Sequence, residues 1–141
     1  FAGMTQPGEK DGEVEKAEWL KQKLTEEKNN WCLGELDDVK NNLLITGYPV
    51  DKLNFIRGKV EDTIPRHLPG KIALLRLDTD WYESTKHELE HLYPLLVPQG
   101  VLLLDDYGAW QGARKATDEY FKGKSEVFFH RIDYTGRMVI K

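Results

Sequence analysis

Residues 72–80 read IALLRLDTD and residues 101–107 read VLLLDDY, so two aliphatic runs of this chain each end in acids. Near-continuous aliphatic runs are typical of strands that are buried on both faces, as in parallel sheets. Ligands collect at the carboxyl ends of such strands. The two runs therefore predict an α/β fold in which four carboxylates gather at one edge of the sheet. These acids are Asp78, Asp80, Asp105 and Asp106.

The four acids predict a divalent-metal site. Like charges held close together resist ionising, so a dense carboxylate cluster binds a cation or shares protons. All-oxygen donor sets favour Mg²⁺, Ca²⁺ or Mn²⁺ over metals that prefer thiolates. An open coordination position would let the metal bind a substrate hydroxyl and leave Asp80 free as a general base. A simpler interpretation stays open, in which Asp78 or Asp105 only caps the following helix.

The rest of the chain predicts helices that alternate with strands, followed by a hairpin. Apolar residues spaced three and four apart indicate amphipathic helices, and Thr85 with Glu88 has the form of a capping box. Two β-rich runs joined by residues 134–136 indicate a terminal hairpin, which would add an antiparallel strand to a mostly parallel sheet. The expected helices cover residues 14–30, 35–46, 85–96 and 111–121, the expected strands residues 53–57, 72–77 and 101–104, and the expected hairpin residues 126–133 and 137–141.

Length and composition restrict the class of protein. The chain has 141 residues and a net charge of −4, with 20 Lys and Arg against 24 Asp and Glu, which fits one domain over residues 1–141. The basic residues are dispersed, which argues against a nucleic-acid-binding face, and no apolar stretch approaches the ~20 residues of a membrane span. Cys32 is the only cysteine, so no internal disulfide can form and we expect a cytoplasmic protein.

Two other enzyme classes share part of this pattern. An aliphatic run that ends in acids resembles the second motif of P-loop nucleotidases, but the phosphate-binding motif Gly-x-x-x-x-Gly-Lys-Ser/Thr is absent from the sequence. A strand followed by Asp-x-Asp also resembles the metal motif of glycosyltransferases that use nucleotide sugars. The glycosyltransferase alternative therefore stays open.

Side chains close to the acids in sequence have roles that the pattern leaves undecided. Trp81, Tyr82 and Trp110 could line a pocket for an acceptor, or pack in the core or in a lid. Arg114 is expected to face the acid cluster as a counter-charge. These interpretations depend on how the loops after the two strands are folded.

Several motifs together resemble the macrocin O-methyltransferase family of S-adenosylmethionine-dependent enzymes, which act on sugar or phenolic hydroxyls of natural products. The similarity covers nearly all of the chain, and its most specific part is the segment around DTDWYEST. The matching segments are FAGM at residues 1–4, Gly58-x-x-x-Asp62-Thr-Ile-Pro65, DTDWYEST at 78–85, LYPLLVPQG at 92–100, DDYG at 105–108 and Gly112-x-Arg114-x-Ala116-x-Asp118.

The resemblance implies roles for particular residues. It implies that a magnesium ion is held by Asp78, Asp105 and Asp106, and that Asp80 serves as the catalytic base. It also implies a Rossmann-like methyltransferase sheet. For S-adenosylmethionine, it implies that the cofactor is contacted by Gly58, Lys59, Val60 and Asp78.

One departure from the family pattern sets the alternatives. The glycine-rich turn after the first strand and the acid that ends the second strand, on which the cofactor rests, have no counterpart in this chain. We therefore expect the carboxyl-terminal portion of a class I methyltransferase domain, lacking the first two strands of the sheet. Two hypotheses follow: a fragment of a Mg²⁺-dependent O-methyltransferase with a small-molecule hydroxyl acceptor, or an inactive metal-binding module that self-associates, for instance as a homodimer, through unpaired strand edges.

Overall fold

The computed structural model describes residues 1–124 and 127–141, which form two compact units. The first unit contains residues 1–7 and 13–59, and the second contains residues 8–12 and 60–141. Residue 126, where the expected hairpin begins, lies outside the described residues. The expectation of a single domain over residues 1–141 stays a prediction.

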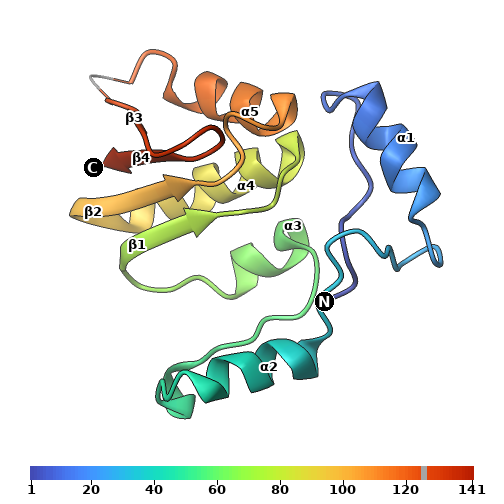
Figure 1. Ribbon diagram of the computed structural model, residues 1–141. Helices are drawn as coiled ribbons and strands as arrows, with labels where there is room; N and C mark the ends of the chain where they lie inside the picture. The colour runs from blue at the N-terminus through green and yellow to red at the C-terminus, as the bar shows by residue number, and fades with distance from the viewer. Residues whose placement is uncertain (125–126) are drawn as a thin grey trace. The chain divides into compact units, whose positions relative to one another are not determined.

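The second unit contains a four-stranded mixed sheet in the order β1-β2-β4-β3 (Figure 1). The two aliphatic runs lie in β1 (Ile72–Leu77) and β2 (Leu96–Leu104), which are parallel neighbours as expected. β2 begins at Leu96, so the expected start of this strand at residue 101 is wrong. The chain ends in a hairpin of β3 (His130–Arg131) and β4 (Arg137–Ile140), and β4 pairs antiparallel with β2. The predicted α/β fold with a terminal antiparallel strand is therefore confirmed, but among the described residues the sheet is mixed and not mostly parallel, because β1 with β2 is its one parallel pairing. The expected lack of the first two strands stays a prediction.

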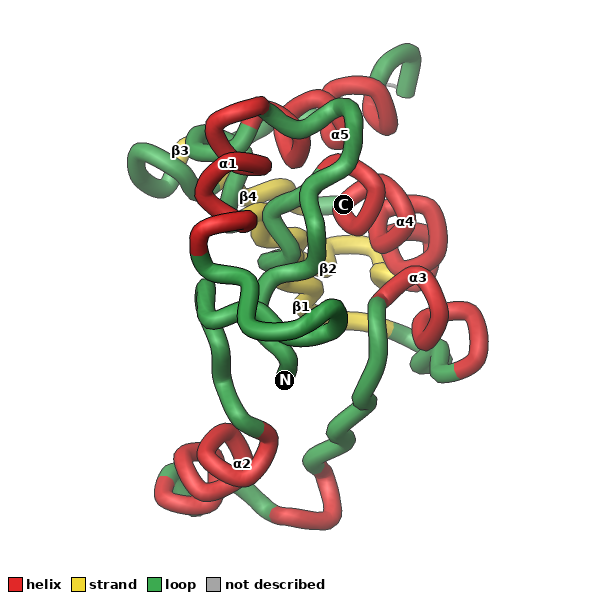
Figure 2. Tube along the Cα trace, turned by 90° about the vertical axis from the view of Figure 1, so that its right-hand side faces the viewer, coloured by secondary structure: helices red, strands yellow, loops and turns green. Residues whose placement is uncertain are grey.

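Two helices of this unit, α4 (Tyr82–Leu92) and α5 (Gln111–Phe121), pack side by side (Figure 2). Two shorter pieces precede β1, α3 (Val60–Thr63) and the 3₁₀ helix η2 (Ile64–Arg66), and the 3₁₀ helix η3 (Tyr93–Leu95) leads into β2. Alternate strand residues and one face of each long helix make the core, because successive strand side chains point to opposite faces. The buried core residues are Ile72, Leu75, Leu77, Leu89, Leu96, Leu102, Leu104, Phe121 and Val139.

The other strand residues lie on the opposite face of the sheet. Leu74 in β1 is paired with Val101 in β2, which is in turn paired with Ile140 in β4. Leu74 and Ile140 are 61% and 55% exposed. Leu74 is therefore an exposed leucine, whereas the leucines on the other face of the same strands are buried in the core.

The first unit contains α1 (Glu13–Lys21), α2 (Leu36–Ile45) and the 3₁₀ helix η1 (Val50–Lys52). Trp19 is buried in this unit, and its indole N–H donates to the Met4 carbonyl at 2.9 Å. Asn29 is also buried, and its side-chain amide donates to the Trp19 carbonyl at 2.8 Å. These bonds hold α1 against the start of the chain and the loop after α1 against the helix.

Two expectations for the first unit are wrong. The helix expected over residues 14–30 ends at Lys21, because Lys23 and Asn29 pair in an isolated bridge that turns the chain back. Residues 53–57 form no strand, since no strand among the described residues pairs with them and a strand needs a partner for its backbone groups. The helix expected over residues 35–46 is confirmed as α2, and Gly47 follows it with φ +76°.

Membrane insertion finds no support in the helices. Among residues 1–124 and 127–141, none of the helices is long and apolar enough to cross a membrane.

Candidate metal centre and active site

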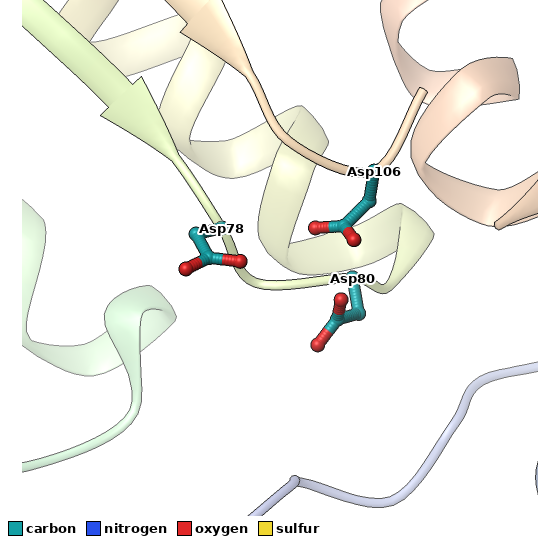
Figure 3. A group of neighbouring side chains, drawn as sticks. All are labelled: Asp78, Asp80 and Asp106. Atoms are coloured by element: carbon teal, nitrogen blue, oxygen red, sulfur yellow. The ribbon is translucent and has the colours of Figure 1, made fainter. Parts of the chain in front are cut away.

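Three carboxylates converge at the carboxyl ends of β1 and β2 (Figure 3). Asp78 follows the last residue of β1, Asp80 lies in the loop that leads into α4, and Asp106 lies in the loop after β2. One oxygen from each of the three carboxylates lies within 4.8 Å of the corresponding oxygens of the other two. Parallel strands end at the same edge of a sheet, which is why side chains 28 positions apart in sequence meet here.

Asp80 reaches the cluster through an unusual backbone conformation. Its φ is +65°, in the left-handed region that most residues other than glycine avoid. The Trp81 N–H donates to the Thr79 carbonyl at 2.7 Å, which closes a tight turn around Asp80. The Trp110 side chain then hydrogen-bonds the Asp80 carboxylate. This turn, and not a continuing strand, sets the direction of the Asp80 side chain.

Asp105 lies outside the group of three carboxylates and shares a basic neighbour with Asp78. Arg76, in β1, bridges Asp78 at 2.5 Å and Asp105 at 3.0 Å. The counter-charge expected from Arg114 is thus supplied by Arg76, while Arg114 lies 3.7 Å from Asp118. The signal for Arg76 was present in the sequence, since an arginine two residues before Asp78 in a strand lies on the same face. The assignment of Asp105 as a metal ligand stays a prediction.

Burial and mutual repulsion favour the protonated forms of Asp106 and Asp80. The pKa of Asp106 is raised to about 8, first by burial and then by the negative charge of Asp80 beside it. Burial is also the main cause of the raised pKa of Asp80, which the hydrogen bonds from Asp106 and Trp110 oppose. The Oδ2 atom of Asp106 is buried and has no hydrogen-bond partner. A buried acceptor without a partner is destabilising, and a bound cation or a hydrogen-bond donor would satisfy it.

The donor set fits a hard divalent cation. Three carboxylates within chelating distance, one of them with an unsatisfied buried oxygen, are the ligands that Mg²⁺ and Mn²⁺ prefer. A cation there would compensate the repulsion that raises the pKa of Asp106. Asp78 and Asp106 would hold such an ion, with Asp80 beside it.

Glu88 is a titratable group of the site that the sequence did not identify. It was expected to form a capping box with Thr85, but α4 begins three residues earlier, at Tyr82, so Thr85 lies inside the helix and is buried. Glu88 instead accepts a hydrogen bond from the Thr79 hydroxyl at 2.8 Å. Burial is the main cause that raises the pKa of Glu88 to about 7, and the negative charges of Glu61, Asp78 and Asp80 add to it.

The raised pKa of Glu88 predicts a stability that falls as pH rises. The folded chain holds the Glu88 proton up to about pH 7, whereas the unfolded chain releases it near the ordinary pKa of 4.5. The unfolding free energy therefore decreases between these two pH values, by about 3 kcal/mol from this group. Urea unfolding at a series of pH values from 4 to 8, on the wild type and Glu88→Gln, measures the effect.

Glu88→Gln isolates this effect from other titrating groups. Glutamine keeps an oxygen that accepts from Thr79 but carries no charge. The variant is expected to match the wild type near pH 4 and to be more stable at pH 8. Stability curves that run parallel across the whole pH range would contradict the prediction.

The expected cofactor residues are divided between the two units. Gly58, with φ +138°, and Lys59 belong to the first unit, whereas Val60 begins α3 in the second. Asp78 lies in the acid cluster of the second unit. Their role in binding S-adenosylmethionine stays a prediction.

Fold and site define a class of protein. A sheet with parallel strands β1 and β2, acids at their carboxyl ends and two helices packed together is an arrangement of Rossmann-like α/β enzymes, which bind ligands at this edge. The chain is similar to the structure of the O-methyltransferase NovP, with a TM-score of 0.83 and 26% sequence identity. The similarity covers 99% of this chain and 56% of NovP.

The chain belongs to the macrocin-O-methyltransferase (TylF) family, whose family model matches residues 1–139. One curated relative is the 8-demethyl-8-(2,3-dimethoxy-alpha-L-rhamnosyl)-tetracenomycin-C 4'-O-methyltransferase of Streptomyces olivaceus, 35% identical over 138 residues, which are 96% of this chain and 50% of that protein. Another is the mycinamicin III 3''-O-methyltransferase of Micromonospora griseorubida, 36% identical over 85 residues, 60% of this chain and 33% of that protein. The chain thus spans half or less of the length of these relatives.

The family confirms the resemblance read from the sequence motifs. Calicheamicin methyltransferase CalS11 has the same fold over 99% of this chain and 56% of its own, with a TM-score of 0.70 at 17% identity. The matches favour a methyltransferase over the glycosyltransferase alternative. They leave open the metal and the residues that contact the cofactor.

Proposed function

We propose that this chain is part of a Mg²⁺-dependent, S-adenosylmethionine-dependent O-methyltransferase. The acceptor would be a sugar or phenolic hydroxyl of a natural product. The observation that carries this proposal is the convergence of Asp78, Asp80 and Asp106 in a chain of the macrocin-O-methyltransferase family. The names of the relatives support the chemistry, since they describe methyl transfer to oxygen on tetracenomycin, mycinamicin and novobiocin derivatives.

The roles of the acids follow from their environments. Asp78 and Asp106 would hold Mg²⁺, because Asp106 has the unsatisfied buried oxygen and Asp78 lies within chelating distance of it. When bound, Mg²⁺ lowers the pKa of an acceptor hydroxyl, and S-adenosylmethionine supplies the methyl group. Asp80 would accept the hydroxyl proton, since its raised pKa brings the carboxylate closer to the pH at which a general base works.

The charge of Arg76 helps to decide which acid is the base. It is half-exposed and neutralises part of the charge of Asp78 and Asp105, the two acids that it bridges. A base works best when its charge is not cancelled by a neighbour. Asp80 is therefore the better placed base, because Arg76 has no ion pair with it among those that the structure describes.

The cofactor and partner assignments complete the proposal. Gly58, Lys59, Val60 and Asp78 would contact S-adenosylmethionine, as the family resemblance implies. We propose a cytoplasmic enzyme that binds a small-molecule acceptor and neither nucleic acid nor membrane, with a homodimer as the assembly to test first.

Titration with S-adenosylmethionine separates the enzyme from an inactive metal-binding module. The enzyme predicts binding at about 1 µM or tighter, roughly −8 kcal/mol, that strengthens when Mg²⁺ is present. Asp78→Asn is expected to remove the strengthening by Mg²⁺, while Asp80→Asn is expected to keep it and lose proton acceptance only. Isothermal titration calorimetry of the three proteins, with and without Mg²⁺, makes the measurement.

The outcomes of this titration are distinct. No heat at a ligand concentration of about 1 mM, a thousand times the expected dissociation constant, would leave only the inactive module. Binding of a nucleotide sugar that depends on Mn²⁺ and is lost in the Asp78→Asn, Asp80→Asn double variant would favour the glycosyltransferase.

A further inference from the structure

Asp11 is a buried acid that the proposed chemistry does not use. It lies in residues 8–12, a short segment that belongs to the second unit, and is only 4% exposed. A carboxylate is rarely buried to this extent unless its oxygens are satisfied by donors. The partners of its hydrogen bonds therefore show which segments Asp11 connects.

The Asp11 carboxylate caps α4 from a distance of 71 residues in sequence. Its Oδ1 atom accepts from the backbone N–H of Tyr82, the first residue of α4, at 2.9 Å. Its Oδ2 atom accepts from the Gly8 N–H at 2.7 Å, which closes the segment on itself. The first N–H groups of a helix have no partner within the helix, and Trp81 at the N-cap position forms no side-chain cap. Asp11 supplies the missing acceptor, with a charge that suits a helix N-terminus.

The same carboxylate also lies against the first turn of α5. Gly112 is the second residue of α5, and a Cβ atom there would collide with Oδ1 of Asp11 and approach the Tyr82 nitrogen to 2.9 Å. Trp110, at the N-cap position of α5, likewise forms no side-chain cap. The starts of α4 and α5 are therefore close together, with one buried carboxylate in contact with both.

These two helix starts carry the acid cluster. Asp80 lies two residues before Tyr82, and its carboxylate is hydrogen-bonded by the side chain of Trp110, two residues before Gly112. The Trp110 backbone N–H donates to the Asp106 carbonyl at 3.0 Å. A shift of either helix start would therefore move Asp80 relative to Asp106.

We propose that Asp11 is a positioning residue for the acid cluster, which holds the starts of α4 and α5 together so that Asp106 stays within chelating distance of Asp78, with Asp80 beside them. The proposal rests on the metal site of the proposed function. Residues that only orient metal ligands change metal affinity by about 10–100-fold when they are replaced. A residue that only stabilises the fold would change it no more than any other variant of equal stability.

Metal affinity is the first test, with Mn²⁺ as the probe and its electron paramagnetic resonance signal as the readout. Asp11→Ala is expected to raise the Mn²⁺ dissociation constant about tenfold or more. Asp11→Asn keeps an acceptor for the Tyr82 N–H, so its Mn²⁺ dissociation constant is expected to lie between those of Asp11→Ala and the wild type. Gly112→Ala leaves Asp11 in the chain but displaces its carboxylate, so it is expected to weaken binding as well.

The matched control is Val139→Ala. Val139 is fully buried in β4, the strand that pairs with β2. Its replacement destabilises the core and leaves the residues at the starts of α4 and α5 unchanged. It is expected to leave the Mn²⁺ dissociation constant within about twofold, even though it lowers the unfolding free energy. Equal weakening in Val139→Ala and Asp11→Ala would overturn the positioning role.

A second readout needs no metal at all. The indole N–H of Trp110, which bonds the Asp80 carboxylate, gives its own signal in a ¹⁵N–¹H NMR spectrum. The chemical shift of this signal is expected to change in Asp11→Ala and in Gly112→Ala and to stay the same in Val139→Ala. An unchanged Trp110 signal in Asp11→Ala would overturn the proposal. If the wild type bound no Mn²⁺, the proposed function would fail while the Trp110 signal still decided the role of Asp11.

Discussion

Replacing Asp106 by Asn is expected to make the chain more stable and unable to hold a divalent cation. The half-buried Asp106 carboxyl resists ionisation, with a pKa raised to about 8, first by its burial and then by the negative charge of Asp80 beside it. A neutral amide removes that repulsion, which we expect to raise the unfolding free energy by about 1 kcal/mol at neutral pH. Loss of a ligand should weaken Mn²⁺ binding by about 100-fold or more, beyond the effect of residues that only orient ligands.

Asp105→Asn is the matched comparison for this variant. It makes the same chemical change one residue away, but Asp105 is paired with Arg76. We expect no gain in stability, and Mn²⁺ binding within about threefold of the wild type, because the proposed ligands are Asp78 and Asp106. Thermal unfolding and Mn²⁺ titration of both variants give the answer. Equal loss of Mn²⁺ binding in the two would restore Asp105 to the ligand set implied by the resemblance.

Leu89→Ala is expected to have the largest effect on folding. Leu89 is fully buried on the face of α4 that packs in the core, so its truncation leaves a cavity between the helix and the sheet. Substitutions of this kind cost about 2–5 kcal/mol. A loss of that size is a large part of the stability of a chain of this length, and urea unfolding followed by circular dichroism measures it.

Leu74→Ala provides the control with identical chemistry. Leu74 lies in β1 but points away from α4 and is 61% exposed, so its truncation opens no cavity. The expected loss is about 0.5 kcal/mol or less. Similar losses at positions 74 and 89 would mean that the two faces of the sheet are equally buried in solution.

The strands and the edge where the acids meet could be predicted from sequence because the information is local. An aliphatic run is a strong strand signal, and an acid that directly follows it is placed by the end of the strand. The approach of Asp78 to Asp106 then follows from the parallel pairing of β1 and β2. No knowledge of distant residues was needed for this step.

The details of the site that were missed depend on residues far apart in the chain. The start of α4 was placed too late because its cap is Asp11, in a glycine-rich segment that gives no helix signal. Residues 53–57 have the composition of a strand, but pairing decides whether a strand forms. The bridge from Arg76 to Asp105 depends on the register of β1 against β2, which hydrophobic patterning does not determine.

The left-handed backbone at Asp80 has a consequence for directed evolution. Glycine adopts a φ of +65° without the steric cost that an aspartate has there, so Asp80→Gly relieves strain at the same time as it removes the proposed proton acceptor. Screening a library for heat resistance alone would therefore enrich glycine at this position, and the selected variants would lack the proposed base. Variants should therefore be screened for the proposed methyl transfer in the same round as thermal tolerance, because cation binding alone would not reveal the loss of Asp80.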